Sequence, residues 1–380
     1  MDFTLTKEQQ LLRDGLTKFL STRYDLEKSR AAAKSGAGWQ PDIWRAFATD
    51  LGILGATMPE DIGGIGGGPV ELLVITEALG HALVVEPYVD SIVVGGGLLH
   101  RAGTAGATSV LQEVVVGDAI VALAATEPDC GDRWDEVSTT AVRADDGDWV
   151  LRGSKIVVPA APLATHLLVT ARTSGADGIS LFLMDSDAAG IEMHGYRTID
   201  DRRAADIVFD GVRATALLGA EGEAASSLDQ ARDEGAAAVC SEAVGCMRKV
   251  LADTVEYCKQ RRQFGQPIGN FQVLQHRMVD MHMELEQAVS AVYLAVLNLH
   301  SDPAKRARSV SAAKATVGRA ARFIGQQAVQ LHGGMGMTEE LAIGHYFKRL
   351  TAIQYEFGST EYHLARYADL TRPSVKTRPA

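Results

Sequence analysis

The sequence predicts a mainly α-helical protein with a small β domain in the middle of the chain. Three observations support this fold class. Apolar residues recur at helical spacing in the first third, short β-branched runs between turn residues begin near residue 119, and a long helical stripe occupies the last third. We therefore expect an N-terminal helical domain at 1–118, a middle β domain at 119–222 and a C-terminal helical bundle at 223–380.

The first third contains several helix signals. Thr6-Lys7-Glu8-Gln9 is a capping box, and apolar residues follow it at helical spacing through Leu20. Further helices are expected from Asp42 and over 71–81. The glycine-rich stretch 58–69 between them has Gly-x-Gly spacings, but no strand leads into it, which favours a loop over a dinucleotide-binding fingerprint.

The middle of the chain carries short strand signals. Turn residues separate the runs, as in the Asp-Asp-Gly-Asp sequence at 145–148. The pattern predicts a small antiparallel sheet domain that ends near Gly219. The expected strands are 120–124, 137–144, 149–153, 155–158, 165–171 and 179–184.

The last third is predicted to form a helical bundle. Apolar residues alternate at steps of four and three, which is typical of a helix packed in a bundle. Asp302-Pro303 interrupts the pattern, and a further helix is expected from Ser309 to Leu331, where glycines stop it. The stripe consists of Leu274, Met278, Met281, Leu285, Ala288, Val292, Ala295 and Leu299.

Composition excludes several classes of protein. Hydrophobic residues make up 46% of the 380 residues and charged residues 22%, as in ordinary soluble globular proteins. The net charge of −11 and the absence of a basic block argue against nucleic-acid binding. The four cysteines form no Cys-x-x-Cys pair, so no metal site is predicted. No apolar run is long enough to span a membrane and the N-terminus has no signal-peptide pattern, so we expect a cytoplasmic protein.

Near the C-terminus, Glu356 lies within the apolar run 352–358. Burial in apolar surroundings raises the pKa of a carboxyl toward neutrality, where it can accept and return a proton. Glu356 is therefore a candidate general base. The alternative is an exposed carboxylate at the end of a helix or strand, with Gly358 as the turn.

Two further motifs suit a phosphate-bearing ligand. Arg261 has a guanidinium that can hold a pyrophosphate, and Phe264 can pack on an adenosine. Gly333 and Gly334 let the backbone approach a ligand closely, and Gln330 can reach a sugar hydroxyl. The alternative for Arg261 and its basic neighbour is a solvated helix end.

In this order, the motifs resemble the acyl-CoA dehydrogenase family over nearly the whole chain. They are Gly52-Ile53-Leu54-Gly55, the Pro-Glu-Asp-Ile-Gly-Gly of 59–64, the Ala-Thr-Glu-Pro of 125–128, the Arg-Arg-Gln-Phe-Gly of 261–265, the Gln-Leu-His-Gly-Gly of 330–334, and Tyr355-Glu356. The resemblance implies a helical domain, a small β-barrel-like domain and a four-helix bundle.

The resemblance also implies a reaction, a cofactor and partners. The reaction is α,β-dehydrogenation of an acyl-CoA thioester, in which a carboxylate removes the α-proton and the β-hydrogen passes as hydride to FAD. An electron-transfer flavoprotein reoxidises the flavin. No metal is implied. The residues implied to bind FAD are Thr126, Arg261, Gln263, Phe264, Phe271, Gln272, Gln330, Leu331, Gly333 and Gly334.

The chain departs from the family pattern at the base. The family places its base between Tyr and Gly in Tyr-Glu-Gly, whereas this chain has one residue more. Alignment on Tyr355 makes Glu356 the base, and alignment on Gly358, which the downstream residues fit, puts Phe357 there. A second base position used in the family falls on Gly235, one residue after Glu234 and about 100° away around a helix.

Two departures concern the flavin ring. Pro159 stands where the family has a threonine that reaches the flavin, and Asp132 replaces a serine. The contacts to the other half of the cofactor are intact. The hypothesis is that the chain is a non-basic subunit of a heterotetramer, meaning a subunit without the catalytic base. It would complete the FAD site of a second dehydrogenase subunit, as expected from its similarity to the small subunits of pimeloyl-CoA-type dehydrogenases. The alternatives are a self-sufficient homotetramer using Glu356 and a flavin-free acyl-CoA-binding or scaffold subunit.

Overall fold

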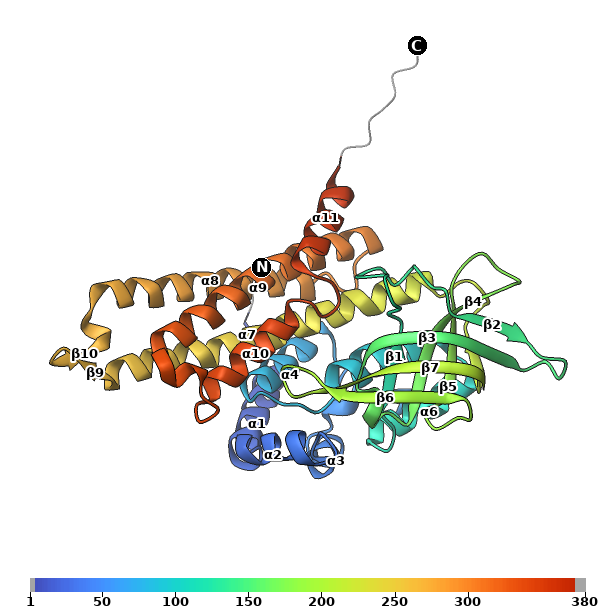
Figure 1. Ribbon diagram of the computed structural model, residues 1–380, viewed down its shortest axis with the longest axis horizontal. Helices are drawn as coiled ribbons and strands as arrows, with labels where there is room; N and C mark the ends of the chain where they lie inside the picture. Colours follow the sequence, from blue (N-terminus) through green and yellow to red (C-terminus); the bar gives the residue numbers. More distant parts are fainter. Residues whose placement is uncertain (1–3, 373–380) are drawn as a thin grey trace, which may run out of the picture. The chain divides into compact units, whose positions relative to one another are not determined.

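The computed structural model describes residues 4–372, which form two compact units that divide at residues 246 and 247 (Figure 1). Helix α7 (Ala225–Gln260) contributes to both units. Residues 1–3 and 373–380, at the ends of the predicted terminal domains, lie outside the described residues. The three predicted domain ranges stay a prediction.

The first unit begins with helices. The predicted capping box is present, because Thr6 Oγ1 accepts from Gln9 N at 3.3 Å and Gln9 Oε1 accepts from Thr6 N at 3.0 Å. The predicted helices at 42 and 71–81 are α3 and α4. The helices are α1 (Lys7–Arg23), α2 (Leu26–Ser35), α3 (Pro41–Thr49), α4 (Pro69–His81), α5 (Gly97–Ala102) and α6 (Ala105–Val116), with 3-10 turns at Ile53–Gly55 and Glu60–Ile62 and a π-helix at Tyr88–Gly96.

Helix α4 crosses α7 near its middle at close range. A Cβ atom on Gly80 would lie 2.0 Å from Glu242 O, and one on Gly245 would lie 1.9 Å from Glu77 O. Only glycine allows the two backbones to approach this closely. The crossing fixes α7 against the N-terminal helices.

The β region of the first unit follows the helices. The strands are β1 (Val121–Ala124), β2 (Thr140–Arg143), β3 (Trp149–Pro159), β4 (His166–Thr173), β5 (Ser180–Asp185), β6 (Ile191–Arg197), β7 (Arg203–Arg213) and β8 (Ala216–Leu218). They run in the order β6-β7-β3-β2-β4-β5-β8, with β1 parallel to β4. Buried side chains such as Leu151, Phe182 and Phe209 form a common core.

Three details of this sheet differ from the prediction. The sheet is mixed rather than antiparallel, because β4 pairs in parallel with both β1 and β2. The strands expected at 149–153 and 155–158 are one strand, β3, because a register shift against β7 between Lys155 and Val158 takes up the irregularity. Strands β6 and β7 were not predicted individually. Strand β6 alternates half-buried and exposed residues only over 191–194 and is exposed from there to Arg197, so its alternation is short.

The second unit contains the end of α7, α8 (Gln272–Val296), α9 (Pro303–His332), α10 (Ala342–Ile353) and α11 (Thr360–Thr371). A short hairpin, β9 (Arg262–Gln263) and β10 (Gln266–Pro267), connects α7 to α8 together with the 3-10 turn Ile268–Asn270 (Figure 1). The predicted stripe on α8 is buried from Met281 to Leu299, which confirms it as a packing face. The predicted fold class, mainly α with a middle β domain, is confirmed.

The predicted start of α9 at Ser309 is wrong. The helix begins at Pro303, and Asp302 caps it by accepting from Lys305 N at 3.0 Å. Proline fits the first helical position because its missing N–H has no partner there in any case. Asp302-Pro303 is therefore a helix start.

Within residues 4–372, no group of three or more His, Cys, Asp or Glu is placed to hold a metal ion, and no helix has the length and hydropathy needed to cross a membrane. All four cysteines are buried, and none of them forms a disulfide.

Candidate cofactor and active site

The hairpin after α7 presents an aromatic ring and basic side chains to solvent. Phe264 is 90% exposed and takes a positive φ of 53°, which is uncommon for a residue other than glycine. Its ring meets that of Phe271 edge-on, with centroids 6.1 Å apart. Arg261 is exposed, and Arg262 donates to Gly265 O at 3.1 Å. The hairpin thus offers an apolar surface beside an exposed guanidinium.

A second open segment follows α9. Gly333 has φ 60° and ψ −141°, and no heavy atom lies within 4 Å of an ideal Cβ on Gly333 or Gly334. Gln330 is exposed one turn earlier, whereas the Leu331 side chain is buried. A ligand can therefore approach the backbone of this turn directly.

Tyr257 and His332 bring the two segments together. Their rings stack with centroids 4.3 Å apart, and Tyr257 Oη donates to His332 O at 3.3 Å. Burial lowers the pKa of His332, so its imidazole is neutral at physiological pH. Sequence reasoning missed this pair, although Tyr257 lies one helical turn before Arg261. The predicted residues Arg261, Gln263, Phe264, Phe271 and Gln272 lie along the hairpin and the start of α8 at this end of the unit.

Replacing Gly333 by Ala is expected to lower the free energy of unfolding by about 1–3 kcal/mol, because its backbone lies in a region that essentially only glycine occupies. Gly334→Ala is the matched control, with a change below about 1 kcal/mol, since an added methyl meets open space and φ is not positive. Urea denaturation of both variants measures the difference. Equal losses would contradict the strained backbone at Gly333.

Thr126, the remaining predicted cofactor residue, lies in the first unit beside a buried ion pair. Thr126 O accepts from Ile156 N at 2.9 Å. Next to it, Glu127 accepts from Lys155 Nζ at 2.7 Å, from Ser138 N at 2.7 Å and from Thr139 N at 3.0 Å. These contacts join the loop after β1 to strand β3.

Both members of the ion pair are charged at neutral pH. Burial by itself raises the pKa of the Glu127 carboxyl, but hydrogen bonds from Lys155, Ser138 and Thr139 lower it to about 2. Burial lowers the pKa of Lys155 to about 8, although Glu127 favours the ammonium. Lys155 also donates to Thr170 Oγ1 at 2.7 Å.

The two positions that depart from the family at the flavin ring also lie in the first unit. Pro159 is exposed at the end of β3, just beyond the bulge, where Val157 has φ 49° and donates its N–H to Asp206 at 2.9 Å. Asp132 is half-buried in the loop after Thr126. Neither the proline nor the aspartate offers a donor of the kind expected there.

Glu356 is held by an arginine. Arg349 Nη1 donates to Oε1 at 2.5 Å and Nη2 donates to Oε2 at 2.9 Å. Arg349 is 3% exposed and Glu356 29%. Both carboxylate oxygens therefore accept from one buried guanidinium, a bidentate arrangement that the apolar neighbours of Glu356 in sequence do not indicate.

The turn after Glu356 is held through its backbone. Phe357 has φ 57°, and its carbonyl accepts from His363 Nε2 at 3.0 Å. The ammonium of Lys314, 1% exposed, donates to Ile353 O at 2.9 Å, Gln354 O at 3.2 Å and Gly358 O at 2.9 Å. The sequence analysis did not identify His363 or Lys314 as contacts of this turn. For Lys314, the available signal was a lysine at a buried position of α9.

The carboxylates near Gly235 are also engaged. Glu234 accepts from Arg101 Nη1 at 3.0 and 2.9 Å through its two oxygens, and from Gln230 Nε2 at 2.8 Å. Asp233 is fully buried. Glu234 is thus bound on both oxygens, as Glu356 is.

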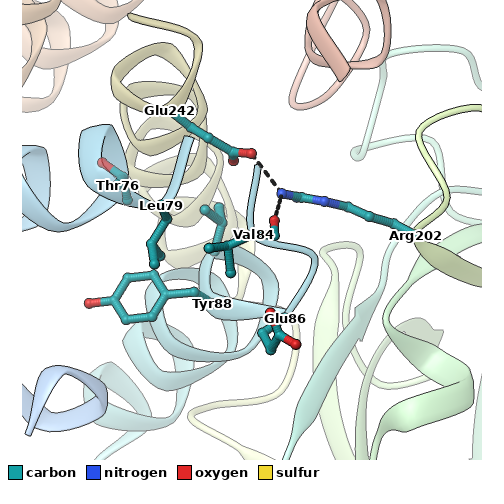
Figure 2. A pocket seen from close by; sticks show the side chains of 8 residues that line it. Thr76, Leu79, Val84, Glu86, Tyr88, Arg202 and Glu242 are labelled. Carbon is teal, nitrogen blue, oxygen red and sulfur yellow. Dashed lines mark hydrogen bonds and ion pairs between the residues drawn. The ribbon is translucent and has the colours of Figure 1, made fainter. Parts of the chain in front are cut away.

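A small cavity lies among α4, the π-helix and α7 (Figure 2). Its volume is about 10 Å³, room for about one water molecule. Arg202 donates to Glu242 Oε1 at 2.6 Å and to Val84 O at 3.0 Å, as Figure 2 shows. Glu86 accepts from Gln40 N at 3.0 Å, and burial raises its pKa. The cavity is too small for an acyl chain and is part of the internal packing.

Comparisons with known proteins agree with the motif order. Models of the N-terminal, middle and C-terminal domains of acyl-CoA dehydrogenases match residues 6–113, 122–212 and 223–370. Acyl-CoA dehydrogenase FadE12 of Mycobacterium tuberculosis is 31% identical, over 98% of this chain and 95% of that protein. The chain belongs to the acyl-CoA dehydrogenase family. Members of this family are oxidoreductases that use FAD.

Solved structures of this family share the fold. A variant of the Tcur3481-Tcur3483 steroid acyl-CoA dehydrogenase superimposes with a TM-score of 0.87 at 30% identity, covering 97% of this chain and 98% of that chain. The ChsE4-ChsE5 complex from Mycobacterium tuberculosis gives a TM-score of 0.86 at 25% identity, with 100% of both chains covered.

The residues of the second unit fit part of FAD. Arg261 offers fixed positive charge for a pyrophosphate, Phe264 offers an exposed ring for an adenine, and the Gly333–Gly334 turn leaves open space for a ribose. The positions expected at the flavin ring in the first unit, Pro159 and Asp132, lack the matching donors.

Proposed function

We propose that this chain is the non-basic subunit of a heteromeric, FAD-dependent acyl-CoA dehydrogenase. The observation that carries the proposal is the bidentate ion pair between Glu356 and Arg349. A general base must turn a carboxylate oxygen toward the substrate proton, whereas this pair orients both oxygens of Glu356 toward Arg349. With both oxygens of Glu356 engaged, we align the chain on Gly358, and Phe357 takes the place of the base.

The second base position, on α7, supports the same conclusion. The family's other base position carries Gly235, and the adjacent Glu234 is bound by Arg101 and Gln230. The carboxylates adjacent to both base positions are therefore oriented toward arginines. The base comes from a second acyl-CoA dehydrogenase chain.

The contribution of this chain is to the cofactor. Arg261, Phe264 and the Gly333–Gly334 turn face outward, so they can meet the adenosine and pyrophosphate of FAD held by a second chain. FAD supplies the hydride acceptor when bound. The complex named for ChsE4 and ChsE5, which shares this fold, supports an assembly of two different chains. Acyl-CoA is the substrate of the assembly, and an electron-transfer flavoprotein accepts its electrons.

The first test measures bound flavin by its yellow colour. The lone chain is expected to purify without bound flavin, whereas the complex isolated from the native host through a tag on this chain is expected to be yellow and to reduce its flavin with an acyl-CoA. A yellow lone chain that reduces its flavin with an acyl-CoA would favour a self-sufficient enzyme. A colourless complex would favour a scaffold subunit.

In that complex, Arg261→Ala is expected to lower FAD content at least tenfold, because a charge-assisted contact to a pyrophosphate contributes about 1.5–3 kcal/mol. Absorbance at the flavin band relative to protein measures the content. Lys259→Ala is the matched control, since Lys259 is an exposed cation at the same end of α7, and it should leave FAD content unchanged. An unchanged FAD content in the Arg261→Ala complex would contradict the shared cofactor site.

A further inference from the structure

The cavity in Figure 2 is lined by residues from several elements of the first unit. Thr76 lies on α4, Glu86 precedes the π-helix, Arg202 lies in the turn between β6 and β7, and Glu242 lies on α7. The volume of about 10 Å³ is close to what one water molecule needs, and a buried water also needs roughly two to four polar partners. This lining offers polar groups of both kinds, donors and acceptors.

Glu86 has one carboxyl oxygen without a partner. The residue is 2% exposed, and its Oε1 accepts from Gln40 N at 3.0 Å. Its Oε2 is buried and has no hydrogen-bond partner within the described part of the chain. A buried polar atom of this kind is unfavourable unless a water completes it.

The arginine beside Glu86 is directed at other acceptors. Arg202 donates to Glu242 Oε1 at 2.6 Å and to Val84 O at 3.0 Å, and its Nε lies 3.9 Å from Asp200 Oδ2. Glu86 therefore lies next to an ion pair without being a member of it (Figure 2).

The surroundings of Glu86 favour its neutral form. Burial raises the pKa of its carboxyl, while Gln40, Tyr24 and Arg202 lower it by less. Burial also raises the pKa values of Tyr24 and Tyr88, so both phenols that face this region are uncharged. A neutral carboxylic acid differs from a carboxylate in having a proton to donate.

We propose that the cavity is a binding site for one water molecule, and that Glu86 holds this water as a neutral carboxylic acid. The proton on Oε2 is donated to the water, and the water donates to acceptors on the lining. Thr76 Oγ1, which gives its own proton to Leu72 O at 2.8 Å, and the Glu242 carboxylate are such acceptors. The inference concerns the first unit alone and does not depend on the proposed function.

A high-resolution crystal structure of the wild type tests the water without any variant. We expect one peak of density in the cavity at about 2.5–3.0 Å from Glu86 Oε2. The peak should be absent from a structure of Glu86→Leu. A dry wild-type cavity would overturn the proposal, as would a water that stays in place in Glu86→Leu.

Infrared spectroscopy in D₂O at neutral pH tests the proton. The wild-type spectrum minus that of Glu86→Gln should contain the C=O stretching band of a protonated carboxyl group. Glu113→Gln is the matched control, because Glu113 is exposed on α6, and its difference spectrum should lack this band. Absence of the band from the Glu86→Gln difference would overturn the neutral acid.

The same proton should appear in the pH dependence of unfolding. The folded chain holds the Glu86 proton more tightly than the unfolded chain, so this stabilisation is complete below about pH 4.3 and is lost as the pH rises. Relative to Glu86→Gln, the unfolding equilibrium constant of the wild type should increase by up to about tenfold per pH unit. Urea denaturation from about pH 5 to about pH 8 measures it, and parallel profiles would contradict the proposal.

Discussion

Replacing Glu127 by Ala is expected to lower the free energy of unfolding by about 3–5 kcal/mol, because it leaves the buried Lys155 ammonium without its carboxylate. The same change removes the acceptor of the Ser138 and Thr139 amides. Chemical denaturation followed by circular dichroism measures the loss. The effect is the largest we expect from a single substitution in the first unit.

The control lies on the same loop. Glu136 pairs with Arg133, but both side chains are exposed, so Glu136→Ala should change stability by about 0.5 kcal/mol or less. A loss from Glu127→Ala as small as that of Glu136→Ala would mean that the ion pair is not a structural requirement.

The ion pair should also contribute to the pH dependence of the wild type's free energy of unfolding at acid pH. The pKa of Glu127 is about 2 in the folded chain and about 4.3 when unfolded, so the stabilisation is present above pH 4.3 and is lost as the pH falls toward 2. Glu127→Gln should lack this part of the acid dependence. An identical acid profile for both proteins would contradict the assignment.

Replacing Glu356 by Ala is expected to destabilise the chain by about 2–4 kcal/mol while leaving turnover of the assembled enzyme within about threefold of the wild type. The destabilisation follows because Arg349 is buried and loses both acceptors. Removal of a general base lowers turnover by about 10²–10⁴-fold or more. Thermal unfolding and single-turnover flavin reduction in the complex measure the two quantities.

Glu340→Ala is the matched control for Glu356→Ala. Glu340 is an exposed carboxylate in the same unit, so neither stability nor turnover should change by much. Loss of turnover by about 10²-fold in a folded Glu356→Ala complex would return the base to this chain. Unchanged stability would mean that the ion pair contributes nothing to the fold.

Local patterns predicted much of the fold. The capping box at Thr6 and the stripe on α8 depend on residues three or four positions apart, and both are present in the structure. The predicted start of α9 was wrong because Pro303 was interpreted as a helix break rather than as the first helical residue. The prediction of two separate strands within β3 was wrong because the bulge depends on pairing with β7, which the local sequence does not reveal.

The contacts that define the candidate site are long-range. Tyr257 and His332 are 75 positions apart, and Lys314 reaches carbonyls about 40 positions away. The Arg349–Glu356 pair spans only seven residues, but it crosses the end of α10, so helical periodicity does not align the two. Composition and spacing could propose a carboxylate at 356, but they could not indicate what binds it.

Lys314 has a consequence for how this family can change. Its ammonium bonds to main-chain oxygens of the turn at 353–358, so its hold does not depend on the side chains at 355–357. The side chain at position 357 can therefore change while these three backbone contacts remain. On the proposed function, this backbone support would let a chain without a catalytic base keep the fold of the turn.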